Sequence, residues 1–114
     1  YPNKPMCQAF KDNMASQGIE MTWPDPNKQY GSSDIGNVSI KIPAIHDYLS
    51  ITDDKEIQAH TTEYAAAAGT PEAQEVCLKG AKGLAMTGCD ILSSEAFQKE
   101  IREYHDKQIP DFYK

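Results

Sequence analysis

The sequence predicts an α/β fold in which short strands pack with helices. Two short apolar segments lie between residues 38 and 51, and two long helical patterns follow them over residues 71–92 and 94–108. Strands and helices combined in this way are typical of a layered α/β domain. Residues 1–114 are near the lower end of one ordinary domain, about 100–200 residues, so we expect one domain or a segment of one.

The first helix is expected over residues 4–18, followed by a loop over residues 19–33. Met6, Phe10 and Met14 recur every four residues, which places them on one helical face ended by a glycine. A helix with one apolar face is most often a packing element. The loop contains two prolines, a glycine and two serines, which favour turns over regular structure.

One or two short strands, joined at Pro43, are expected within residues 38–51. Val38, Ile40 and Ile42 alternate with polar residues, as in a half-buried strand, and Pro43 separates them from a second apolar segment. The acidic stretch that follows is expected to be a solvated turn, because a charge run is far more often surface than site.

The helix over residues 71–92 has the clearest signals in the chain. Thr70 offers a capping hydroxyl, and Pro71 suits the first helical position. Small and apolar residues then recur at spacings of three and four, which predicts close packing against a sheet or another helix. These residues are Ala73, Val76, Cys77, Gly80, Ala81, Leu84 and Ala85.

The last helix is expected from its cap at Ser94 to about residue 108. Phe97, Ile101 and Tyr104 lie on one of its faces, and a proline follows at position 110. His105 falls on the polar side of this helix, and we expect it at the surface.

Composition and charge exclude several classes of partner. Seventeen acidic residues against eleven basic ones give a formal net charge of −6, and no basic cluster is present. Nucleic acid and anionic membrane surfaces are therefore excluded. No apolar run approaches the roughly 20 residues that span a bilayer, and residues 1–20 lack a secretory signal. Tyr1 in place of methionine indicates an excised piece.

The cysteines indicate the cellular compartment. Cys7, Cys77 and Cys89 form no CxxC pair. On one helix, Cys77 and Cys89 would be roughly 18 Å apart, too far for a disulfide. We expect three free thiols and a cytoplasmic location.

Two short motifs point to chemistry. The first is the small-residue loop Gly31-Ser32-Ser33-Asp34-Ile35-Gly36-Asn37-Val38-Ser39, and the second, Ala59-His60-Thr61-Thr62-Glu63-Tyr64, sets a histidine before a helical run. Together with the segment Ala81 to Asp90, they resemble the C-terminal part of the catalytic domain of the co-catalytic zinc amidohydrolases, the aminoacylase and glutamate-carboxypeptidase type. Within this family, the chain most resembles the branch of aminobenzoyl-glutamate hydrolase and the β-alanyl-lysine dipeptidases.

The resemblance implies that His60 is a metal ligand. Neutral imidazole is a common zinc ligand, and in the family a histidine at this place completes the shell of one of two zinc ions, with manganese as an alternative metal. The family's other ligands come from a His-x-Asp motif, a glutamate pair and a further acid. None of these is in the chain, so the isolated chain is expected to be inactive.

The resemblance also implies that Gly31, Ser32 and Ser33 receive the carboxylate of the substrate. A glycine permits unusual backbone angles, and N–H groups and hydroxyls can bind an anion. The alternative for these residues is a simple turn that caps a short helix. Asp34 and Asn37 either orient this loop or reach His60 as partners of the metal ligand.

His46 follows the family's isoleucine-histidine-proline-tyrosine pattern, with Asp47 in the place of the proline. This departure leaves the role of His46 open.

The sequence is compatible with two functions. The first is a segment of a metal-dependent amidohydrolase that cleaves N-acyl amino acids or dipeptides, working with the rest of the catalytic domain. The second is a non-catalytic binding or assembly module. Separated from the rest of a catalytic domain, the chain is expected either to self-associate through its apolar strand or helix face or to be only partly folded.

Overall fold

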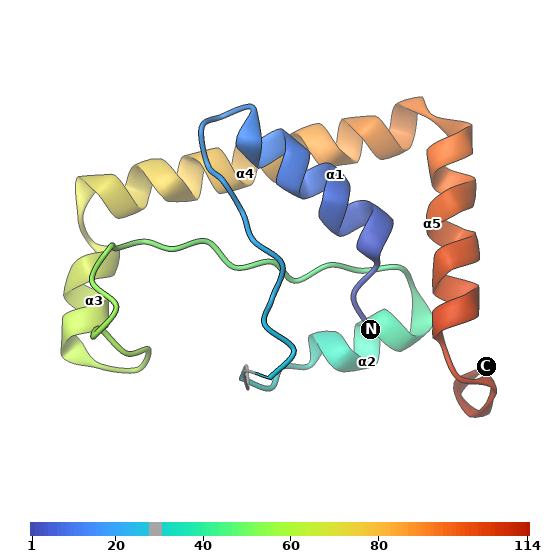
Figure 1. Ribbon diagram of the computed structural model, residues 1–114, viewed down its shortest axis with the longest axis horizontal. Coiled ribbons are helices and arrows are strands. Elements are labelled where there is room, and N and C mark those ends of the chain that lie inside the picture. Colours follow the sequence, from blue (N-terminus) through green and yellow to red (C-terminus); the bar gives the residue numbers. More distant parts are fainter. Residues whose placement is uncertain (28–30) are drawn as a thin grey trace.

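The computed structural model describes residues 1–27 and 31–114, and regular structure in these residues is entirely helical. In chain order the elements are α1 (Lys4–Ala15), α2 (Ile35–Lys41), α3 (Thr62–Ala68), α4 (Pro71–Ser93), α5 (Glu95–Gln108) and the 3₁₀ turn η1 (Asp111–Tyr113). Figure 1 shows the long helix α4 crossing the molecule, with α1 lying against it and α5 descending from its end. No described helix is long and apolar enough to cross a membrane.

The predicted α/β class is therefore wrong, because the described residues contain no strand. Residues 38–41 belong to α2, and residues 43–50 form no strand, although the Ala44 carbonyl accepts one hydrogen bond from the Asn3 N–H at 2.9 Å. A short apolar run can form either a helix or a strand, and its periodicity alone does not decide between them. A strand also requires a neighbouring strand that satisfies its N–H and C=O groups in turn, and the described residues contain no such neighbour.

Side-chain caps mark the starts of three helices whose presence was predicted, although α1 ends at Ala15, three residues before the predicted Gly18. Asn3 accepts a hydrogen bond from the Met6 N–H at the start of α1, at 3.3 Å. Thr70 does the same for α4, at 3.2 Å from Ala73 N, and Ser94 for α5. Each cap satisfies one of the N–H groups that the first turn of a helix leaves unpaired. The predicted bounds of α4 and α5 are confirmed to within one residue.

The core lies where α1, α4 and α5 meet. Phe10 and Met14 of α1 are buried against α4, and Ile101 and Ile109 are buried on the side of α5. Asn3 is fully buried, and its amide donates to the Ile101 carbonyl at 3.0 Å, which ties the start of α1 to α5.

The predicted apolar stripe of α4 divides into two faces. Ala73 and Gly80 are buried, as expected, while Cys77, Leu84 and their small neighbours are exposed. The helix packs through its smallest residues: Gly80 faces the Leu49 side chain, and Gly83 faces Phe10 and Met14 of α1. The larger apolar side chains then point outward.

The predicted loop over residues 19–33 is confirmed where it is described, since residues 19–27 and 31–33 form no helix or strand. Residues 28–30 of that loop lie outside the described residues. The acidic stretch at 53–56 is exposed and irregular, as expected for a solvated turn.

Candidate functional site

The predicted carboxylate-binding loop lies exposed at the start of α2. Residues 31–34 are all exposed. The Ser33 carbonyl accepts a hydrogen bond from the Gly36 N–H at 3.2 Å, and its hydroxyl oxygen accepts one from the Ile35 N–H at 3.4 Å. This is a serine turn that leads into a helix. It also leaves the side chains of Ser32 and Ser33 at the surface, where a ligand can reach them.

The other loop residues have local roles. Gly31 is exposed at the start of the described part of this loop, and a Cβ at this position would meet nothing within 4 Å. Asp34 and Asn37 are exposed, and the Asn37 N–H donates to the Asp34 carbonyl at 2.9 Å. Neither makes a hydrogen bond to His60 in the described part of the chain.

His60 has an unusual backbone conformation. Its φ is +67°, and among the described residues it is the one non-glycine with a positive φ. This conformation costs roughly 1–2 kcal/mol for an ordinary residue. Thr61 fixes the backbone on both sides of His60. Its hydroxyl accepts a hydrogen bond from the Tyr64 N–H at 3.1 Å and donates one to the Gln58 carbonyl at 2.7 Å. The imidazole is exposed just before α3. An outlier of this kind is a reason to look for function.

The residues around His60 do not form a complete metal centre. In residues 1–27 and 31–114, no group of three or more His, Cys, Asp or Glu side chains is placed to hold a metal ion. Protein zinc sites use at least three protein ligands. His60 could therefore supply one ligand, and the described residues do not supply the others.

The extended segment that contains His46 places a carboxyl group against a thiol. The His46 ring is exposed and packs on Tyr48, with ring centroids 5.0 Å apart. Burial raises the pKa of the adjacent Asp47 carboxyl, although a hydrogen bond with the Cys7 thiol and the charge of His46 act in the opposite direction. Burial, together with Asp47, raises the pKa of Cys7 to about 12. A thiol with this pKa is protonated and is not a nucleophile.

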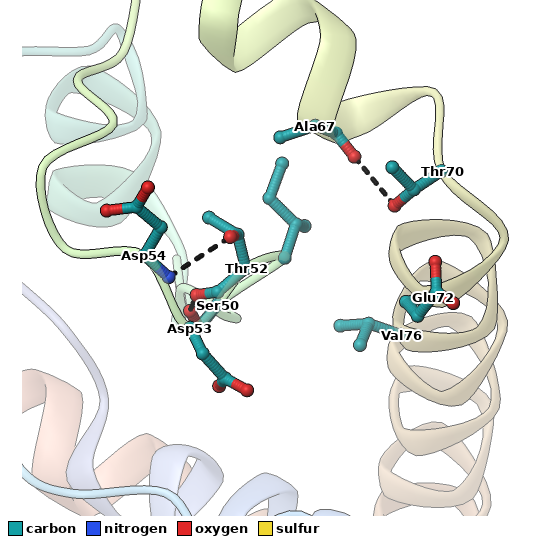
Figure 2. A pocket seen from close by; sticks show the side chains of 9 residues that line it. Ser50, Thr52, Asp53, Asp54, Ala67, Thr70, Glu72 and Val76 are labelled. Carbon is teal, nitrogen blue, oxygen red and sulfur yellow. Dashed lines mark hydrogen bonds between the residues drawn. The ribbon is translucent and has the colours of Figure 1, made fainter.

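A hollow of about 480 Å³ lies between α3, the start of α4 and the turn at residues 50–54 (Figure 2). Its lining includes the carboxylates of Asp53, Asp54 and Glu72, together with hydroxyl groups of Thr52 and Thr70. In Figure 2, the turn lies on one side of the hollow and Thr70 and Glu72 on the other. Three carboxylates repel an anion. The lining of this hollow therefore does not suit a carboxylate, and neither His60 nor the 31–34 loop is part of it.

The expectation for His105 is wrong. Its side chain is buried, 8% exposed, and its Nε2 lies 2.9 Å from the carbonyl oxygen of Ser39 in α2. The signal was present in the sequence, because His105 follows Ile101 by four residues and shares its apolar face. The three cysteines are free, as predicted.

Comparison with known proteins relates the chain to dipeptidases. Over 104 residues, 90% of the chain, it is 39% identical to the Xaa-Arg dipeptidase of Mus musculus and 40% identical to that of Homo sapiens. The chain spans about a quarter of these relatives, 24% and 23% of their lengths. No family model matches the chain, and no solved structure matches it either. The chain is thus a homologue of curated peptidases over nearly its whole length.

Proposed function

We propose that the chain is one segment of a metal-dependent dipeptidase or amidohydrolase that cleaves the amide bond of dipeptides or N-acyl amino acids. The main support is the identity of 39% and 40% to two Xaa-Arg dipeptidases over 104 residues. The proposed substrates are small peptides, including those that end in arginine. In this proposal the chain is inactive alone and works with the rest of a catalytic domain.

The exposed surface of α4 supports the proposal that the chain is one segment of a larger catalytic domain. Leu78, Leu84 and Leu92 are 72%, 56% and 82% exposed, and they lie on one side of the helix with Ala81 and Ala85. A contiguous exposed apolar face is typical of an interface. We propose that the rest of the catalytic domain covers it.

His60 is the proposed metal ligand. Its imidazole is exposed, and its backbone is held in a rare conformation by Thr61 and the start of α3. The metal, zinc or manganese, would polarise the amide carbonyl and activate water, which is the chemistry that such ions supply. The chain contributes one ligand, and the remaining ligands and the general base lie elsewhere in the proposed enzyme.

The loop of Gly31, Ser32 and Ser33 is the proposed receiver of the substrate carboxylate. Both serine side chains are exposed next to the first turn of α2. Hydroxyl groups form hydrogen bonds to a carboxylate that are worth about 1.5–3 kcal/mol each. These contacts would fix one end of a dipeptide while the amide bond is attacked.

The test uses a dipeptidase-length protein that contains residues 1–114. His60→Ala should lower kcat/KM for arginine-ended dipeptides by more than about 100-fold, the upper range for residues that merely orient a metal ligand. The thermal stability of the metal-free protein should be unchanged, because the side chain is exposed. His46→Ala is the matched control, since it removes another exposed imidazole.

Two results would contradict the proposal. A His60→Ala protein with normal rate and metal content would remove this residue from the site. Chelator-sensitive turnover by residues 1–114 alone would show that the chain is not merely a segment. Binding of dipeptides without turnover in the longer protein would favour the alternative, a non-catalytic binding module.

A further inference from the structure

The helix α2 ends at a carbonyl group that the local backbone cannot satisfy. Ser39 is 2% exposed and lies in the last turn of α2. In a continuing helix its carbonyl would accept a hydrogen bond from the N–H of residue 43. Residue 43 is proline, which has no N–H. A buried carbonyl in this position requires a donor from elsewhere.

His105 supplies that donor from α5. Its Nε2 lies 2.9 Å from the Ser39 oxygen, and the two residues are 66 positions apart in the chain. A carbonyl oxygen only accepts hydrogen bonds, so the proton is assigned to Nε2. Figure 1 shows the end of α2 beside the lower part of α5, where this contact lies.

Among the described residues, few other contacts fix α2, and the nearest backbone bond runs from the Asn3 N–H to the Ala44 carbonyl, 2.9 Å, beyond the end of the helix. The helix has seven residues, and Ser39 is the one that is buried. Isolated helices shorter than about 12–15 residues are marginal in water. The Lys41 ammonium donates to the Tyr113 carbonyl at 3.3 Å, but this contact is exposed, and the Tyr1 amino group donates to the Ser39 hydroxyl at 3.2 Å. The buried bond from His105 is therefore the main attachment of the helix to α5.

We propose that His105 is a positioning residue for the loop of residues 31–34. By holding the Ser39 carbonyl it fixes α2, and α2 in turn fixes the place of Ser32 and Ser33. The inference rests on the proposed function, in which these two serines receive the substrate carboxylate. His105 itself is on the far end of α2 from the loop, and it acts through the helix.

The first experiment measures hydrogen exchange along the 114-residue chain. His105→Leu removes the donor while keeping an apolar side chain, and His105→Gln retains an N–H near the position of Nε2. In His105→Leu, the α2 amides should exchange faster while the α4 amides are unchanged, and His105→Gln should restore the normal rates. Unchanged exchange in α2 of the leucine variant would overturn the proposal.

The second experiment measures kinetics in the dipeptidase-length protein. His105→Leu should raise KM for an arginine-ended dipeptide about two- to tenfold, the range of one hydrogen bond. KM for the corresponding amide should change less, kcat should be nearly unaffected, and His105→Gln should rescue the difference. A general loss of folding would change the kinetic constants for the acid and the amide substrate equally. That result would overturn the positioning role.

A double variant separates this inference from the proposed function. Ser32→Ala with Ser33→Ala tests the loop directly, by the same comparison of acid and amide substrates. If that variant discriminates between them and His105→Leu does not, the positioning role is overturned and the proposed loop function stands. If the serine variant shows no discrimination, the loop function fails, and the exchange experiment still decides whether His105 fixes α2.

Discussion

Gly83 of α4 lies directly against the side chain of Met14 in α1, with no space for a β carbon between them. A Cβ at position 83 would overlap the Met14 sulfur and would lie 3.0 Å from Cε2 of Phe10. Met14 is fully buried and Phe10 is 3% exposed, so neither side chain can move into solvent. This contact sets the distance between α1 and α4.

Gly83→Ala should therefore destabilise the chain, while Gly88→Ala should stabilise it. Both changes improve helix propensity by about 1 kcal/mol, but a Cβ at position 88 would meet nothing within 4 Å. The difference between the two variants isolates the cost of overpacking, about 1–3 kcal/mol. Urea denaturation of both variants measures it. Equal stabilisation by the two substitutions would show that α1 and α4 are not packed this closely.

Sequence reasoning predicted the helices whose ends are marked by local chemistry. Thr70, Pro71 and Ser94 act on neighbouring N–H groups, so their effect can be read without knowing the fold. The burial of Phe10 and Met14 likewise follows from a period of four residues. A helical run was also expected after His60, and it is present as α3.

The errors concern properties that depend on distant residues. Residues 38–42 alternate like a strand, but strand formation requires a partner segment, and no such partner is present in the described chain. His105 was assigned to the surface because its own helix is polar there, while its partner, the Ser39 carbonyl, lies 66 residues away. The geometry around His60 could not be predicted, because a positive φ has no periodic signal.

The half-buried Asp47 carboxyl should make stability depend on pH. Burial raises its pKa in the folded chain above the usual value, and its buried Oδ2 atom has no hydrogen-bond partner among residues 1–27 and 31–114. Between the usual and the raised pKa the folded state holds more protons than the unfolded state. The free energy of unfolding therefore falls as pH rises through this window, and the full cost of the buried charge is present at pH 7.

Asp47→Asn should accordingly raise Tm at pH 7 and have a smaller effect near pH 3, where Asp47 is protonated. Asp53→Asn is the matched control, because it removes one negative charge from an exposed position. Thermal denaturation followed by circular dichroism at both pH values provides the comparison. The same Tm change at both pH values would argue against a buried, charged Asp47.

The three thiols should differ in reactivity. Cys77 and Cys89 are exposed, whereas Cys7 is buried with its pKa raised to about 12. Since the thiolate is the reactive form, iodoacetamide at pH 8 should modify two cysteines quickly and Cys7 only after unfolding. Mass spectrometry of digested samples over time identifies the sites, and a sample in denaturant should show all three modified. Rapid labelling of Cys7 in the folded chain would contradict its packing against Asp47.

The exposed apolar face of α4 should cause the 114-residue chain to self-associate. Leu78, Leu84 and Leu92 occupy the same side of the helix, and the described part of the chain leaves them uncovered. Burying apolar surface is favourable by about 25 cal/mol per Å², so two copies gain by covering this face. Leu84→Glu would place a charge in that contact and should give a monomer, with the monomer fraction measured by sedimentation or light scattering over a range of concentrations.

Ile42→Glu is the matched control for this prediction, because Ile42 and Leu84 are both 56% exposed. Ile42 follows α2 at the start of the extended segment. If two copies paired through the backbone of this segment and not through α4, the contact would include Ile42. If Ile42→Glu gives the monomer and Leu84→Glu does not, association uses the extended segment. A wild-type chain that is monomeric at every concentration would show that the α4 face needs no cover, and would weaken the proposal that the rest of a catalytic domain packs there.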